Sequence, residues 1–198
     1  PASTPQPQEN NNDAAASSIA AYGTRIDCDC HLPLELPDSS LIRHRLTLSA
    51  HTHEKFENTF TENLPFYTAH GREVFLHTDR EFTGSDVGQH WCYEVKDIVR
   101  FYWTGGNDNI YYQLDEKGDL KLLGFWFIHL LLPLFFTLED RYDFLHAGAV
   151  EVDQKPILFI APSMGGKSTL TDYFLKQGHT LVSDDKVATF RENEIGRA

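Results

Sequence analysis

Cysteine is scarce in this chain, since Cys28, Cys30 and Cys92 are the only three. So few cysteines, in an odd number, do not make the disulfide framework of a small secreted domain, which favours a reducing compartment. The N-terminal region also lacks a charged segment followed by an apolar stretch, so no signal peptide is visible. We therefore expect a cytoplasmic protein.

Basic residues are few and unclustered. The chain has 17 Lys+Arg against 29 Asp+Glu, a formal net charge of −12. Proteins that bind nucleic acid along a surface carry clustered Lys and Arg, so we expect no nucleic-acid partner. By contrast, a hydrophobic content of 41% and an aromatic content of 13% exclude a disordered chain and can supply one or two cores.

The first part of the chain changes composition near residue 18. Residues 1–18 are polar and rich in Pro, Gln, Asn and Ser, so we expect a disordered tail. From 19 to 120, apolar runs alternate with turn residues at intervals of about 8–12 residues. The runs lie at 73–77, 91–95, 98–103 and 110–114, and the turn clusters at 105–109 and 116–119. This spacing predicts a β-rich N-terminal domain of antiparallel strands.

The longest apolar stretch, residues 122–138, falls short of the roughly 20 residues that a bilayer core requires. It also contains Gly124, His129 and Pro133. We expect a buried helix, bent where Pro133 removes a backbone donor, rather than a membrane span.

The region 121–198 shows an α/β pattern. β-branched and apolar residues at 146–152 and 157–160 predict two strands, and helix formers at 168–177 before Gly178 predict a helix. A further strand is expected at 180–183, which completes a βαβ unit. The expected fold class is thus α/β, or α+β over the whole chain, with a β-rich N-terminal region followed by a nucleotide-binding core.

Residues 161–168 read APSMGGKS, which matches the Walker A pattern except that Ala161 replaces the first glycine. Glycines let a loop turn its N–H groups toward phosphate oxygens, and the following helix adds its positive end. Lys167 would contact the β/γ-phosphates and the Ser168 hydroxyl would ligate Mg²⁺. A glycine-rich turn with a solvated lysine is the simpler alternative, but the flanking strand and helix favour a phosphate loop. The predicted nucleotide-binding residues are Ser163, Gly165, Gly166, Lys167, Ser168 and Thr169.

Two adjacent carboxylates, Asp184 and Asp185, follow the next strand. Beside a polyanion they would repel it without a metal, so Mg²⁺ is implied. One carboxylate can hold the metal, for which we favour Asp185, and the other can accept a hydroxyl proton. The alternative is a pair of solvated acids at a strand end.

A weaker constellation is Cys28-x-Cys30-His31, which His51-x-His53 could complete. C-x-C is not the usual zinc spacing and no second cysteine pair is present, so zinc is disfavoured.

The segment from His146-Ala147 through APSMGGKSTL to KQGHTLVSDDKVATF, which ends at Phe190, resembles the C-terminal domain of HPr kinase/phosphorylase. Ser-Thr-Leu after the loop resembles the HPr-kinase-related proteins more closely, and Tyr22-Gly23 and the Leu-Pro-rich stretch at 32–37 fit their front halves loosely. The likeness covers roughly residues 145–190 and implies a core similar to phosphoenolpyruvate carboxykinase. In such a core, Asp184-Asp185 would lie near the middle, so we expect a partial kinase core, truncated at the C-terminus.

The resemblance implies an ATP- and Mg²⁺-dependent kinase that phosphorylates a Ser or Thr hydroxyl of a protein or peptide, and it allows a homo-oligomer. It implies catalytic roles for Asp184 or Asp185, with His146 near them. Ala161 and Met164 stand where HPr kinases usually have glycine, and Thr169 replaces their usual glutamate, which argues against HPr itself as acceptor and against the reverse phosphorylase reaction.

Two other functions stay open. One is a nucleotide-binding scaffold or switch that phosphorylates nothing. The other is a carboxykinase-like small-molecule enzyme. It is disfavoured because the sequence shows no recognisable set of substrate-binding arginines.

Overall fold

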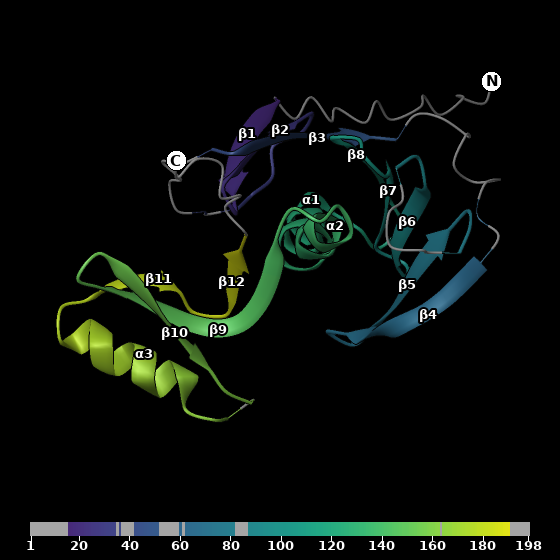
Figure 1. Ribbon diagram of the computed structural model, residues 1–198. Helices are drawn as coiled ribbons and strands as arrows, with labels where there is room; N and C mark the ends of the chain where they lie inside the picture. Colours follow the sequence, from purple (N-terminus) through teal and green to yellow (C-terminus); the bar gives the residue numbers. More distant parts are fainter. Residues whose placement is uncertain are drawn as a thin grey trace, which may run out of the picture. The chain divides into compact units, whose positions relative to one another are not determined.

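The computed structural model describes residues 16–34, 36, 42–51, 60, 62–81, 87–162 and 164–190. The chain divides into two compact units, Pro1–Ile128 and His129–Ala198 (Figure 1). This division falls inside the apolar helical stretch, eight residues beyond the predicted boundary at 120, because that stretch contributes side chains to both units. The fold is mixed α/β and rich in β structure, as expected at that coarse level.

The first unit contains one eight-stranded sheet with the order β1-β2-β3-β8-β7-β6-β5-β4. Its strands are β1 Ser17–Ala21, β2 Thr24–Cys28, β3 His44–Ala50, β4 Glu62–Ala69, β5 Arg72–Thr78, β6 His90–Val95, β7 Val99–Thr104 and β8 Asn109–Leu114. The four strands expected between residues 73 and 114 are confirmed as β5 to β8, which pair as antiparallel neighbours. The expectation of purely antiparallel pairing is wrong, because β3 pairs in parallel with both β2 and β8.

The predicted tail ends earlier than expected. Ser17 and Ser18 belong to β1, where they pair with Cys28 and Asp27 of β2. Tyr22 and Gly23 between these strands both have positive φ, of 51° and 66°, as a tight two-residue hairpin turn requires. The polar composition of residues 1–18 did not indicate this strand, because the strand is held by backbone hydrogen bonds to β2, which side-chain composition does not report. The rest of the predicted tail, residues 1–15, lies outside the described residues.

The apolar stretch is helical from Leu120 to Leu138, as α1 Leu120–Trp126, the π-helical turn η1 Phe127–Leu131 and α2 Leu132–Leu138. In the first unit, α1 lies on the concave side of the sheet (Figure 1), and Phe127 packs against Phe101 with ring centroids 5.9 Å apart. The irregularity expected at Pro133 is the π turn η1, which ends directly before α2. Pro133 lies in the first turn of α2 and has no N–H to donate to the carbonyl of the residue four positions earlier.

This helical stretch has 19 residues and is long and apolar enough to cross a membrane, while 56% of its most apolar part is buried inside the protein. A core helix of a globular protein has the same length and composition, so the stretch by itself is weak evidence for a membrane span.

The second unit contains a four-stranded antiparallel sheet. Its elements are β9 Asp143–Val152, β10 Lys155–Ile160, α3 Lys167–Lys176, β11 Thr180–Ser183 and β12 Lys186–Thr189. The predicted succession of strands and helix is confirmed. β10 and β11 flank β9 on opposite edges, each antiparallel to it, so the connection through α3 crosses over β9 (Figure 1).

A glycine sets how closely α3 approaches β9. Gly148 of β9 is buried, and a Cβ atom there would lie 2.4 Å from the Thr171 Oγ1 of α3. The buried residues of α3 are accordingly Lys167 and Thr171, one turn apart, whereas Leu170 is 46% exposed. The helix therefore presents the base of Lys167 to the sheet, and this orientation positions the site described next.

Candidate functional site

The 161–166 connection joins β10 to α3 through a tight turn. Gly165 N–H donates to the Pro162 carbonyl at 2.9 Å. A Cβ at Gly165 would lie 2.8 Å from the Ala161 Cβ and 2.9 Å from the Pro162 carbonyl oxygen. The methyl group of Ala161 is therefore accommodated because residue 165 has no side chain. Ser163, a predicted nucleotide contact, lies outside the described residues.

The N-terminus of α3 is open toward solvent. Gly166 is its N-cap with φ 85°, so no side chain caps the first turn, and Ser168 and Thr169 on that turn are exposed. The first N–H groups of a helix have no intrahelical partner and carry its positive end. This arrangement suits an anion.

Lys167 is the cation of this loop. Its side chain is only 8% exposed, and the ammonium group donates to the carbonyl oxygens of Ala161 at 2.8 Å and Pro162 at 3.4 Å. The lysine is thus folded back onto the loop. These two bonds use two of its three N–H donors, so a phosphate oxygen could accept from the third or replace one of the backbone acceptors.

Asp184 and Asp185 occupy a break between β11 and β12, which both pair with the same edge of β9. The break is held by two bonds, from Ala147 N–H to the Asp185 carbonyl at 3.1 Å and from the Ser183 hydroxyl to the Lys186 carbonyl at 2.8 Å. The backbone of the break is therefore fixed to the sheet, while both carboxylates stay exposed.

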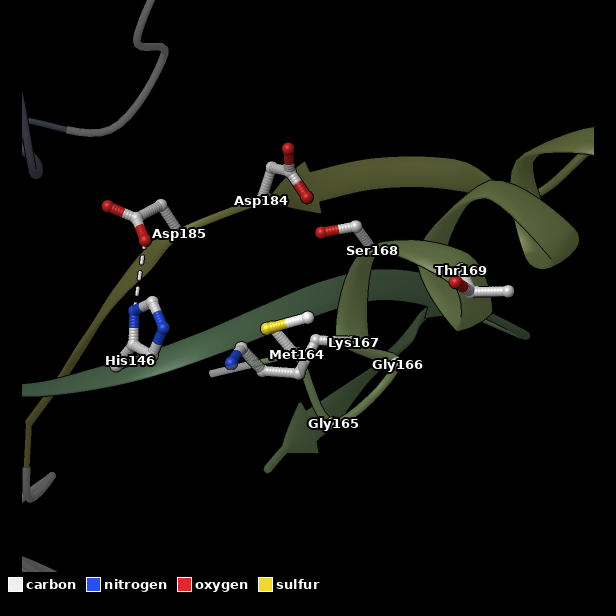
Figure 2. Close-up of a pocket in the computed structure, with 9 residues that line it drawn as sticks. All are labelled: His146, Met164, Gly165, Gly166, Lys167, Ser168, Thr169, Asp184 and Asp185. Atoms are coloured by element: carbon white, nitrogen blue, oxygen red, sulfur yellow. Dashed lines mark ion pairs between the residues drawn. The ribbon is translucent and has the colours of Figure 1, made fainter. Parts of the chain in front are cut away.

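His146 on β9 lies beside these acids. Its Nδ1 is 2.9 Å from Asp185 Oδ1, and the side chains are 61% and 69% exposed (Figure 2). Such an exposed pair adds little stability because water screens it. It does, however, orient the Asp185 carboxylate and leaves that of Asp184 directed toward the space beside Ser168 (Figure 2).

Lys186 is a residue of this region that the sequence analysis missed. Its ammonium group donates to the His129 carbonyl. In a regular α-helix this carbonyl would accept from the N–H of residue 133, which proline lacks. Burial lowers the pKa of Lys186, and the neighbouring Asp185 opposes that shift. The signal available in the sequence was Pro133, which cannot donate an N–H to the carbonyl four residues earlier.

These groups surround one cavity of about 370 Å³ in the second unit. Its lining residues are His146, Met164, Gly165, Gly166, Lys167, Ser168, Thr169, Asp184 and Asp185 (Figure 2). Every predicted site residue that the structure describes is therefore brought to the same cavity. The open helix terminus and the side-chain-free turn at Gly165 fit a phosphate group at one side, with the acids opposite.

A magnesium ion would have Ser168 and Asp185 as its predicted protein ligands. Within the described ranges, no group of three His, Cys, Asp or Glu side chains could hold a metal ion. Mg²⁺ usually takes one or two carboxylates together with substrate phosphates, so a hydroxyl and an acid at this cavity fit an ion that arrives with a nucleotide.

If Mg²⁺–ATP binds at this loop, replacing Gly165 with alanine should weaken that binding about tenfold, because both close contacts force the turn to open by an amount that costs roughly 1–3 kcal/mol. Calorimetric titration measures this. Gly166→Ala serves as the comparison for steric contact, since its Cβ would meet nothing within 4 Å and any loss there reflects only the strain of its positive φ. Adding Ala161→Gly to Gly165→Ala should restore part of the affinity. Equal affinities of the parent chain and Gly165→Ala would refute the tight turn as a binding element.

Comparison of the chain with protein-family models, curated proteins and solved structures finds no match, so its own residues carry the functional interpretation.

Proposed function

We propose that this chain binds Mg²⁺–ATP and transfers its γ-phosphoryl group to a Ser or Thr hydroxyl of a protein or peptide, as a P-loop kinase of the HPr-kinase-related type. The observation that carries the proposal is the shared cavity. It combines an open helix N-terminus, a glycine turn and a lysine with two carboxylates and a histidine from strands on the other side.

The loop side of the cavity would bind the triphosphate. The N–H groups at Gly166, Ser168 and Thr169 would face phosphate oxygens, and Lys167 would turn from its carbonyl acceptors toward the β/γ-phosphates. The Ser168 hydroxyl would hold Mg²⁺ together with one of the two acids, either Asp185, which was predicted, or Asp184, which is directed toward the space beside Ser168 (Figure 2). When bound, the ion would offset repulsion between the acids and the nucleotide and neutralise charge on the transferred group.

The acid side would serve the acceptor. The acceptor oxygen bonds to the γ-phosphorus, the bond from that phosphorus to the bridging oxygen breaks, and ADP leaves. The hydroxyl proton passes to Asp184 or Asp185. His146 is 2.9 Å from Asp185 and would hold that carboxylate in place, which leaves Asp184 the less restrained of the two acids.

One observation favours the second candidate, a nucleotide-binding switch without kinase activity. The side chains of His146 and Asp185 are 61% and 69% exposed, so water reaches the place where transfer would occur. Kinases exclude water there to prevent hydrolysis, whereas a switch that only binds nucleotide has no such need.

The experiment incubates the full chain with Mg²⁺ and ATP labelled with ¹⁸O in the γ-phosphoryl group, in the presence of a Ser/Thr peptide library, followed by mass spectrometry. Labelled phosphopeptides that disappear with the Asp184→Asn, Asp185→Asn double variant support the kinase. Calorimetric binding of Mg²⁺–ATP without any labelled peptide supports the switch. A chain that does not bind Mg²⁺–ATP overturns both.

A further inference from the structure

The four sulfur atoms of the chain differ sharply in their access to solvent. Cys28, Cys30 and Cys92 are 4%, 4% and 3% exposed. Burial raises the pKa of all three thiols, that of Cys28 to about 12. Peroxide reacts with the thiolate form of cysteine. These cysteines are therefore protected from oxidation, both because peroxide cannot reach them and because they stay protonated. Met164, the one methionine of the sequence, is fully exposed at 101%.

The choice of methionine at position 164 is not explained by a contribution to folding stability. Its φ is 64°, a left-handed conformation that costs a side-chain-bearing residue about 1–2 kcal/mol relative to glycine. A fully exposed side chain gains no burial to offset this strain. The thioether is held at the mouth of the cavity, on the same side of the loop as the Lys167 ammonium group (Figure 2).

We propose that Met164 is an oxidation site at which peroxide forms the sulfoxide, and that the sulfoxide weakens anion binding at the 161–166 loop. A sulfur lone pair attacks one peroxide oxygen, the O–O bond breaks, and the S–O bond forms as water leaves. The sulfur is oxidised by two electrons and the peroxide is reduced by two. The consequence for nucleotide rests on the proposed function, whereas the oxidation itself does not.

The effect on binding follows from the polarity of the sulfoxide. The sulfoxide oxygen is a strong hydrogen-bond acceptor. It could accept from the donors that we assign to phosphate, which are the Lys167 ammonium group and the N–H groups of the uncapped first turn of α3. The unbranched methionine side chain can bend back to these donors. One such internal bond should reduce the affinity for Mg²⁺–ATP about 3- to 10-fold.

The test treats the full chain with hydrogen peroxide and maps oxidised peptides by mass spectrometry. Mg²⁺–ATP affinity is then titrated before treatment, after treatment and after incubation with methionine sulfoxide reductases. We expect the sulfoxide at Met164 ahead of any oxidation at the three cysteines, a 3- to 10-fold weaker affinity, and its recovery on reduction.

Two variants of similar length sharpen the result. Met164→Leu cannot be oxidised, so its affinity should be the same before and after peroxide. Met164→Gln places an amide acceptor at the loop and should weaken binding without peroxide. Cysteine oxidation ahead of Met164, or an oxidised Met164 with unchanged affinity, overturns the proposal. If the untreated chain does not bind Mg²⁺–ATP, the regulatory role fails with the proposed function, while the peptide map still decides the oxidation site.

Discussion

Replacing Lys167 with methionine should abolish phosphoryl transfer and weaken Mg²⁺–ATP binding about 10- to 100-fold. The expected loss of affinity corresponds to the roughly 1.5–3 kcal/mol that a hydrogen bond to a charged group contributes. Lys167 is the only lysine or arginine among the described residues that line the cavity, so no other ammonium or guanidinium group there can replace it. Transfer suffers more than binding because negative charge on the transferred group must be stabilised as the bond breaks.

Lys167 also holds the loop, so its replacement needs a folding control. The ammonium group donates to the carbonyls of Ala161 and Pro162, and methionine removes both bonds, although the Pro162 carbonyl still accepts from Gly165 N–H. Lys167→Arg keeps a charged donor and should retain part of the affinity. Lys176→Met is the matched control, because Lys176 lies in the last turn of the same helix, where it pairs with Asp172. Titration with Mg²⁺–ATP and thermal denaturation separate binding from stability. If Lys167→Met and Lys176→Met bind equally well, the loop is not a phosphate site.

The predictable part of the site is the part that is contiguous in the chain. Gly165, Gly166 and Lys167 follow an apolar strand and precede a helix, and the structure confirms both flanking elements. His146 and Asp185 are different. They meet only because β12 pairs with β9 in the register that sets Lys186 opposite His146. No local pattern encodes that register, and the family resemblance was the reason to expect the two residues near each other.

The same distinction explains the larger sheet. Turn residues such as Gly105-Gly106 indicated its hairpins, because a turn fixes the register of the strands it joins. The parallel pairs β2–β3 and β3–β8 cannot be joined by a two-residue turn, and both pairs are separated along the chain by longer segments. Their pairing depends on packing of both sheet faces, which neither periodicity nor turn chemistry reports.

The helical periodicity of α3 illustrates a third limit. Leu170, Phe174 and Leu175 correctly indicate a helix, but of these only Phe174 packs on the sheet, where its ring centroid lies 5.3 Å from that of Phe159 on β10. Leu170 and Leu175 are exposed, and the buried residues of the helix are Lys167 and Thr171. A polar pair can lie there because Gly148 removes a side chain from β9 and the Thr171 hydroxyl donates to the Lys167 carbonyl at 3.1 Å. The polar part of the buried face therefore depends on one glycine on another element, and it includes Lys167, whose ammonium group contacts the loop.

Gly148→Ala should consequently damage the site from a distance. The new Cβ would lie 2.4 Å from Thr171 Oγ1, so either the Thr171 side chain rotates and loses its bond to the Lys167 carbonyl, or α3 shifts away from β9. We expect a loss of about 1–3 kcal/mol of local stability, and faster amide hydrogen exchange along α3 and β9 measures it. Mg²⁺–ATP binding should weaken as well, because Ser168 and Thr169 move with the helix while Asp184 stays with the sheet.

The Thr171→Ala variant tests whether Gly148→Ala acts through the contact with Thr171 Oγ1 or through a general destabilisation of β9. Alone it removes one hydrogen bond to the Lys167 carbonyl, and alanine favours the helix, so its own effect should be within about 1 kcal/mol. Combined with Gly148→Ala it removes the colliding oxygen, and the next nearest atom of residue 171, its Cβ, is 3.8 Å away. The double variant should therefore be more stable than Gly148→Ala and should recover nucleotide affinity. Strict additivity of the two changes would show that α3 does not rest on Gly148, and the alignment of loop and acids would then need another cause.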